Sequence, residues 1–198
     1  MITIERYYDK WDFDLTHFRH KVYNELGASA SIDFSYNELV NKFYNNKFIE
    51  EIYKFSNKKW DKTYFDCIEA IKINDQIVGI SGAAIHNNSV RILMHRYSLF
   101  EFRQIANNYT WHKDGVIDQH LDYAKNINKQ AIFFTIYEHN KTLKVFSNYL
   151  KKRKSNKNKP LLGKFEYFNK PVLFNNTLQT IFYYKINSNY NFALKEIL

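Results

Sequence analysis

The most regular alternation of apolar and polar positions lies in the stretch 64–100, where two short polar turns separate three apolar runs. The first turn is Asn-Asp at 74–75, and the second is Asn-Asn at 87–88. Such pairs favour tight hairpin turns, because Asn and Asp tolerate a positive φ. The pattern therefore predicts three antiparallel strands in series. The middle strand carries Gly79 and Gly82, which either leave a bare patch that a ligand or another backbone can approach, or mark a bulge or tight packing under a helix.

The rest of the chain shows two periodicities. Apolar residues at helical spacing predict helices at about 16–26, 35–58 and 115–126 and one that opens near Asn140, whereas continuous or alternating apolar runs predict strands at 2–8, 131–137, 164–174 and 179–186. The inner face of the helix at 115–126 is expected to consist of Val116, Ile117, His120, Leu121 and Ala124. The stretch 102–115 reads as an irregular connection.

This order of elements favours a single α+β domain over residues 1–198. The first strands are linked by hairpins, whereas helices and strands alternate in the second half. We therefore expect a mixed, mostly antiparallel central sheet flanked by helices, with one crossover connection around the helix at 115–126.

The chain contains a single cysteine, Cys67, within a predicted strand. No internal disulfide can form, and we expect a buried thiol, because no cationic neighbour in the sequence would lower its pKa. A cytoplasmic protein is the expectation, and no long apolar run or signal-peptide pattern opposes it. The formal net charge of +9 suits a polyanionic partner. AT-rich codons alone would also give a composition rich in Asn, Lys, Ile, Phe and Tyr.

One spacing could bring metal ligands together. Asp14, His17 and His20 are three residues apart, so they could face one metal ion from a helix. The alternative is a helix N-cap followed by two half-exposed histidines. No other catalytic or metal-ligand spacing stands out, and we expect no metal cofactor.

The order of elements resembles that of the GNAT superfamily of acyl-CoA N-acyltransferases, most strongly over 64–187. The family's second and third strands, joined by a tight turn, look like IEAIKINDQIVGISGAAI at 68–85. Asn140 follows FFTIYEH and matches the Asn that commonly opens the helix after the fifth strand. The resemblance implies a GNAT-like, three-layer arrangement of helices around the sheet and an acyl-CoA, such as acetyl-CoA, as substrate.

The family's most informative motif is Arg/Gln-x-x-Gly-x-Gly/Ala, whose backbone N–H groups approach the CoA pyrophosphate at a helix N-terminus. The matching stretch here is WHKDGVIDQHL at 111–121. Trp111 stands at the Arg/Gln position and Asp114 at the first Gly, whereas Gly115 is one residue out of phase. The Asp would oppose the ligand's charge, which the preceding His and Lys could partly offset. The cofactor-binding positions that the resemblance implies are Met94, His95, Arg96, Trp111, His112, Lys113, Gly115, Val116 and Asn140.

Amide formation from a thioester needs a base for the amine, a donor for the thioester oxygen and a proton for the leaving thiolate. His95 is our candidate for the base, because an unperturbed histidine titrates near neutral pH. The alternative is that His95 is an ordinary half-exposed strand residue. Ser147 occupies the position of the family's frequent general acid, a Tyr seven residues after the Asn, and serine is a far weaker acid. His95 and Ser147 are the catalytic positions that we predict.

Two classes of function remain open. The first is an N-acyltransferase that moves an acyl group, most simply acetyl, from acyl-CoA to an unidentified amine. The second is a non-catalytic protein of the same fold, which binds nucleic acid or an acyl carrier protein through the basic run at 151–159. An acyl carrier protein could also be the acyl donor, because its acidic surface would suit a basic rim. We expect no membrane partner.

Overall fold

The computed structural model describes residues 1–7, 66–98, 105, 109–111, 113–138, 143–144, 147–148, 150, 161–174 and 177–196. The helices predicted at 16–26 and 35–58 lie outside these residues, and so does the possible metal group of Asp14, His17 and His20. The basic run at 151–159 and Asn140 also lie outside them.

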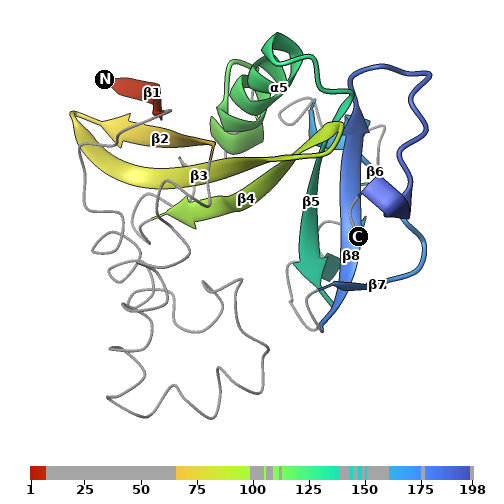
Figure 1. Cartoon of the computed structure of the whole chain (residues 1–198). Coiled ribbons are helices and arrows are strands. Elements are labelled where there is room, and N and C mark those ends of the chain that lie inside the picture. The colour runs from red at the N-terminus through yellow and green to blue at the C-terminus, as the bar shows by residue number, and fades with distance from the viewer. Residues whose placement is uncertain are drawn as a thin grey trace, which may run out of the picture.

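The described strands form one mixed sheet (Figure 1). Its order is β1-β2-β3-β4-β5-β8-β6, and β7 also pairs with β8. The strands are β1 Ile2–Tyr7, β2 Cys67–Ile73, β3 Gln76–His86, β4 Ser89–Ser98, β5 Ala131–Tyr137, β6 Glu166–Tyr167, β7 Val172–Phe174 and β8 Thr177–Lys185. Every pair is antiparallel except β4 with β5, so the predicted mixed, mostly antiparallel sheet is confirmed.

The three-stranded meander predicted at 64–100 is present as β2, β3 and β4. Asn74, Asp75 and Asn87 all have a positive φ, of 48°, 64° and 48°. This is the backbone conformation that tight hairpin turns require, and Asn and Asp adopt it at modest cost. The two polar pairs therefore set the register of all three strands.

Both glycines of β3 lie beside irregularities of the sheet. The register between β2 and β3 shifts after Ile71, which pairs with Gly79. The register between β3 and β4 shifts between Ile80 and Gly82. The bulge interpretation of these glycines is therefore confirmed.

Helix α5 runs from Val116 to Asn126 and connects β4 to β5, which lie parallel. The predicted crossover is therefore confirmed, because a parallel connection needs such a helix. All five residues predicted for the inner face of this helix are buried, as is Tyr123. Among the described residues, no helix is both long enough and apolar enough to cross a membrane.

Two predictions about irregular segments need correction. The single strand predicted at 164–174 is wrong, because β6 and β7 are separate short strands and the chain bends between them before Pro171. Proline has no N–H group to donate to a neighbouring strand, which favours such a break. The stretch 102–115 is not wholly irregular, because Ile105 and 109–111 are helical.

Strand β5 is buried on both of its faces, as its continuous apolar sequence predicts. On the α5 side, Ile132, Phe134 and Ile136 join a large core that includes Trp111. On the other side, Phe133 packs in a second cluster with Phe192, from the C-terminal segment. The C-terminal segment ends in a short 3₁₀ helix, Leu194–Glu196. Strand β5 therefore lies between two hydrophobic clusters, one on each face of the sheet.

Candidate functional site

The parallel strands β4 and β5 begin side by side and then diverge. Their pairing joins Ser89–Arg91 to Ala131–Phe133. Beyond this point, β4 continues along β3 and β5 continues along β8. Figure 1 shows the two strands separating from this common start, with α5 above them. Strands that separate in this way turn backbone N–H and C=O groups toward each other without pairing them, which is where an extended, amide-bearing ligand can bind.

Strand β4 bulges within its diverging part. Leu93 pairs with Gly82 and Tyr97 pairs with Ile80, so the three residues 94–96 lie opposite the single residue Ser81. Such a bulge re-aims backbone groups away from the neighbouring strand. The predicted cofactor-binding residues Met94, His95 and Arg96 are the three bulged residues. Only their backbone is described, so the role of the His95 side chain as a base stays a prediction.

One residue of the loop before α5 has a backbone conformation that glycine favours. Asp114, aligned with the first Gly of the motif, has φ 62°, in the left-handed region that glycine favours. Gly115 is the N-cap of α5, and no side chain among the described residues caps that end of the helix. The carboxylate of Asp118, one turn into the helix, accepts a hydrogen bond of 2.9 Å from the Asp114 N–H.

The remaining predicted site residues lie around this loop or outside the described part of the chain. Lys113 is exposed beside Asp114, whereas Val116 is buried. The Trp111 side chain is fully buried against Phe134 and Phe165, so the ligand contact predicted for Trp111 would involve its backbone. Ser147 is a half-buried residue in a helical segment. His112 and Asn140 lie outside the described residues, and all of these assignments stay predictions.

A buried polar group lies between α5 and the strands β2 and β3, close to the β4 bulge. Glu69 of β2 pairs with Ser81 of β3, the residue that stands opposite the bulge. The Glu69 side chain is fully buried and forms an ion pair with Arg6 of β1, with 2.5 Å between Nε and Oε1. The Arg6 guanidinium also donates to the backbone oxygen of Gln119 and, over 3.0 Å, to its side-chain oxygen. Arg6 thereby links the edge strand to helix α5.

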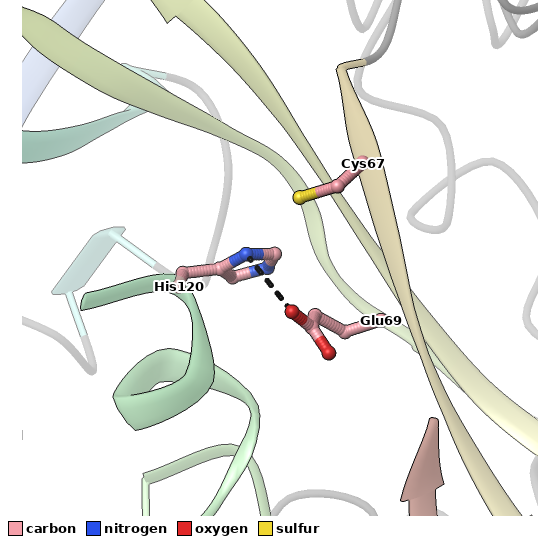
Figure 2. A group of neighbouring side chains, drawn as sticks. All are labelled: Cys67, Glu69 and His120. Atoms are coloured by element: carbon pink, nitrogen blue, oxygen red, sulfur yellow. Dashed lines mark ion pairs between the residues drawn. The ribbon is translucent and has the colours of Figure 1, made fainter. Parts of the chain in front are cut away.

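His120 of α5 completes this group, and Figure 2 shows it facing Glu69 with the Cys67 sulfur nearby. Its Nε2 lies 2.9 Å from the Ser81 hydroxyl, and its Nδ1 lies 3.9 Å from Glu69 Oε1. One donor atom from each of Cys67, Glu69 and His120 lies within 4.8 Å of the other two. All three residues are buried, which confirms the buried state expected for the thiol of Cys67.

Burial controls the ionisation of this group. It raises the pKa of the Cys67 thiol to about 12 and lowers the pKa of His120 to about 3. It also raises the pKa of Glu69 to about 7, although the Arg6 guanidinium pulls that pKa down. At neutral pH the thiol is therefore protonated and the imidazole is neutral, while Glu69 carries a partial negative charge beside Arg6.

The sequence carries two signals of this group, although they do not predict that its residues lie together. Glu69 and Lys72 interrupt an otherwise apolar strand, and Glu69 shares a face with Cys67 and Ile71. His120 was placed on the inner face of its helix. A carboxyl group and an imidazole that are both directed into one core need polar partners there. The pairing of β2 with β1, which supplies Arg6, has no local signature in the sequence.

Comparisons with known proteins identify the fold. No protein-family model matches the chain, and a search of the curated proteins finds no match. Among solved structures, the chain is similar to a Desulfovibrio desulfuricans protein described as an acetyltransferase of the GNAT family, with a TM-score of 0.54, 8% identity and coverage of 93% of this chain and 99% of that one. An N-acetyltransferase from Staphylococcus aureus Mu50 gives a TM-score of 0.50 with 13% identity, over 93% of this chain and 97% of the other.

Proposed function

We propose that this chain, which has the GNAT fold, is an N-acyltransferase that moves an acyl group from acyl-CoA to an amine. The observation that carries the proposal is the divergence of β4 from β5 together with the bulge at 94–96. The pantetheine arm of CoA is an extended chain with two amide groups, so it can pair with the facing backbone edges as a strand would. The bulge supplies backbone N–H groups for the thioester oxygen.

The helix N-terminus after this strand suits the phosphates of CoA. Gly115 caps α5 without a side-chain cap among the described residues, and Asp114 holds the left-handed conformation of a glycine. Backbone N–H groups and the helix dipole favour an anion there. The carboxylates of Asp114 and Asp118 weaken that attraction, so we expect CoA to bind less tightly than it would to a loop with glycine at 114.

In the proposed reaction, the amine nitrogen attacks the thioester carbon and its proton passes to a base, for which His95 is the candidate. The oxygen becomes negatively charged while the backbone of the bulge donates to it. The carbon–sulfur bond then breaks, and the CoA thiolate takes up a proton. Ser147 is the residue predicted at the general-acid position, and its high intrinsic pKa makes it a weak donor.

Calorimetric titration with CoA and acetyl-CoA tests the proposal. We expect one CoA per chain, and we expect Asp114→Asn to bind CoA about five-fold more tightly, because removing one nearby like charge is worth about 1 kcal/mol. Asp122→Asn is the matched control, since Asp122 is an exposed carboxylate of the same helix that pairs with Lys125. Its affinity for CoA should equal that of the unaltered protein.

Release of free CoA thiol in the presence of candidate amines then tests transfer itself. Binding without transfer to any amine would favour a non-catalytic role on the same fold. The two carboxylates at the N-terminus of α5 are the observation that favours this second candidate. If neither the unaltered protein nor Asp114→Asn binds CoA, the acyl-CoA proposal fails, and titration with an acyl carrier protein becomes the next test.

A further inference from the structure

The buried group beneath α5 contains the donor types that zinc prefers. Cys67 offers a sulfur, Glu69 an oxygen and His120 a nitrogen, and these atoms lie within 4.8 Å of one another. Sulfur, nitrogen and carboxylate oxygen are the usual ligands of Zn²⁺ in proteins. We propose that these three residues bind a zinc ion, which fastens α5 to β2 next to Ser81, the residue opposite the β4 bulge.

Two atoms of this group lack hydrogen-bond partners although they are buried. Glu69 Oε2 and His120 Nδ1 have none within the described part of the chain. Leaving a polar atom buried without a partner is unfavourable, and such atoms mark places where an ion or a water molecule belongs. These two atoms without hydrogen-bond partners belong to Glu69 and His120, which face each other from the sheet and the helix (Figure 2). A bound zinc ion would use both lone pairs.

The other polar atom of each of these two residues already has a partner. His120 Nε2 lies 2.9 Å from the Ser81 hydroxyl, which can accept its proton and so leave the lone pair on Nδ1. Glu69 Oε1 accepts from Arg6, which orients the carboxylate. Ligands of zinc in proteins are commonly held in this way, with the second atom of a histidine or carboxylate fixed by a hydrogen bond.

The distances require only a small contraction. Zinc bonds are about 2.3 Å to sulfur and about 2.0 Å to nitrogen or oxygen, so two tetrahedral ligand atoms stand roughly 3.5 Å apart. His120 Nδ1 lies 3.9 Å from Glu69 Oε1, the oxygen that also accepts from Arg6, and one donor atom from each of the three residues lies within 4.8 Å of the other two. Rotation of the Glu69 and Cys67 side chains about their own bonds can close these gaps. A water molecule completes the tetrahedron.

The thiol loses its proton to solvent on binding, as a zinc-bound cysteine does. One thiolate and one carboxylate then offset the two positive charges of the ion, so the group keeps only the single positive charge of Arg6. Arg6 does not depend on Glu69 alone, because it also donates to Gln119 and its side chain keeps 15% of its surface exposed. Without metal, a buried water molecule between Nδ1 and Oε2 is the competing explanation.

Cobalt(II) provides a specific probe of this site. Cys67 is the only cysteine of the chain, so a sulfur-to-cobalt charge-transfer band can arise only from it. We expect tag-free protein, freed of metal with a chelator and equilibrated with Co²⁺, to bind one ion with this band, and Zn²⁺ to displace the cobalt. Zn²⁺ should also raise the melting temperature of the unaltered protein.

Three variants locate the ion. Cys67→Ser should lose the charge-transfer band, and His120→Gln should bind Co²⁺ at least ten-fold more weakly. His17→Gln/His20→Gln is the matched control for the other candidate spacing and should bind as the unaltered protein does. The proposal fails if the unaltered protein binds no Co²⁺ or Zn²⁺, or if it binds Co²⁺ without a charge-transfer band. Since the readout is made on the unaltered protein, a variant that does not fold cannot obscure it.

Discussion

The two ends of the sheet bury different kinds of side chains. Beneath α5, strand β2 places Glu69 in the core, where it meets Arg6 and His120. Around β5 and β8 the core is aromatic instead, and Phe134 and Phe182 stack with ring centres 5.2 Å apart. The first core depends on charge and hydrogen bonding, and the second depends on packed area.

This difference corresponds to the two edges of the proposed acyl-CoA site. The polar core includes Ser81, the residue opposite the bulge of β4, whose backbone groups the proposed site needs at a particular angle. The aromatic core encloses β5 on both faces and holds the other edge rigid. Hydrogen bonds and ion pairs are directional, so they suit the positioning of a bulge, whereas aromatic packing suits a strand that needs only to stay in place. The comparison predicts that the two cores respond differently to mutation and to pH.

The largest effect is expected in the aromatic core. Phe134 is fully buried and contacts Trp111, Phe165 and Phe182. Phe134→Ala should lower the free energy of unfolding by about 4 kcal/mol, through lost transfer energy and the cavity left behind. Urea denaturation at several pH values should give the same loss throughout. Leu173→Ala, at a side chain that is 62% exposed, is the control and should change stability by less than about 0.5 kcal/mol.

The polar core should respond to the loss of a single charge. Arg6→Met keeps most of the aliphatic stem but leaves the Glu69 carboxylate buried without its cation, which should cost about 3 kcal/mol at pH 8. The matched control is Lys72→Met on the neighbouring strand, because the Lys72–Glu5 pair is partly exposed and should be worth less than about 1 kcal/mol. The comparison between the two cores would break if both substitutions cost the same in chemical denaturation.

The same difference explains which parts of the structure the sequence could predict. The meander and α5 follow from local signals, since residues 74–75 and 87–88 determine their own turns and the helix carries its own apolar stripe. The fold class and the order of the elements along the chain follow from such local signals. The aromatic enclosure of β5 was also predictable, because a run such as AIFFTIY has no polar face to expose to water.

The site was less predictable because it depends on pairing between distant segments. The bulge at 94–96 arises from the register of β4 against β3. No residue within it indicates from sequence alone that three residues of β4 stand opposite one residue of β3. The buried polar group joins residues that are far apart in sequence: Ser81 and His120 are 39 positions apart, and Arg6 and Glu69 are 63 positions apart. Pro171 signals the break in 164–174, but the apolar residues around it favour the prediction of one continuous strand. In the sequence, the only local sign of such a long-range contact is a polar residue, such as Glu69, within an otherwise apolar strand.

The dependence of stability on pH distinguishes the contributions of Glu69 and His120, the two titrating groups of the polar core. In metal-free protein the folded pKa is about 7 for Glu69, raised from 4.5, and about 3 for His120, lowered from 6.5. Between pH 4.5 and 6.5 the folded protein holds one proton on Glu69 and the unfolded chain holds one on His120, so these groups leave stability unchanged. Below pH 4.5 the unfolded chain binds a second proton, on Glu69, whereas the folded protein binds its second proton, on His120, only near pH 3. The free energy of unfolding should therefore fall by about 2 kcal/mol between pH 4.5 and pH 3.

Two variants should expose the opposing contributions. In His120→Gln only the raised pKa of Glu69 remains, so stability should be greatest below pH 4.5 and fall as pH rises through about 7. In Glu69→Gln only the lowered pKa of His120 remains, so stability should be greatest above pH 6.5 and fall as pH drops. Urea titrations in the presence of a chelator measure both curves. Slopes of the same sign in the two variants would contradict the assignment of protons.

The smallest effect is expected at the turn between β3 and β4, which contacts the residues just before β5. Asn87 has φ 48°, and its backbone oxygen accepts a hydrogen bond of 2.7 Å from Lys129, just before β5. Asn87→Val should cost about 1 kcal/mol, because a β-branched residue resists the left-handed conformation, whereas Asn87→Gly should be nearly neutral. Asn88→Val is the control, since the neighbouring Asn88 does not have a positive φ. Equal losses for the two valine variants in thermal denaturation would mean that side-chain contacts, and not the backbone, hold this turn.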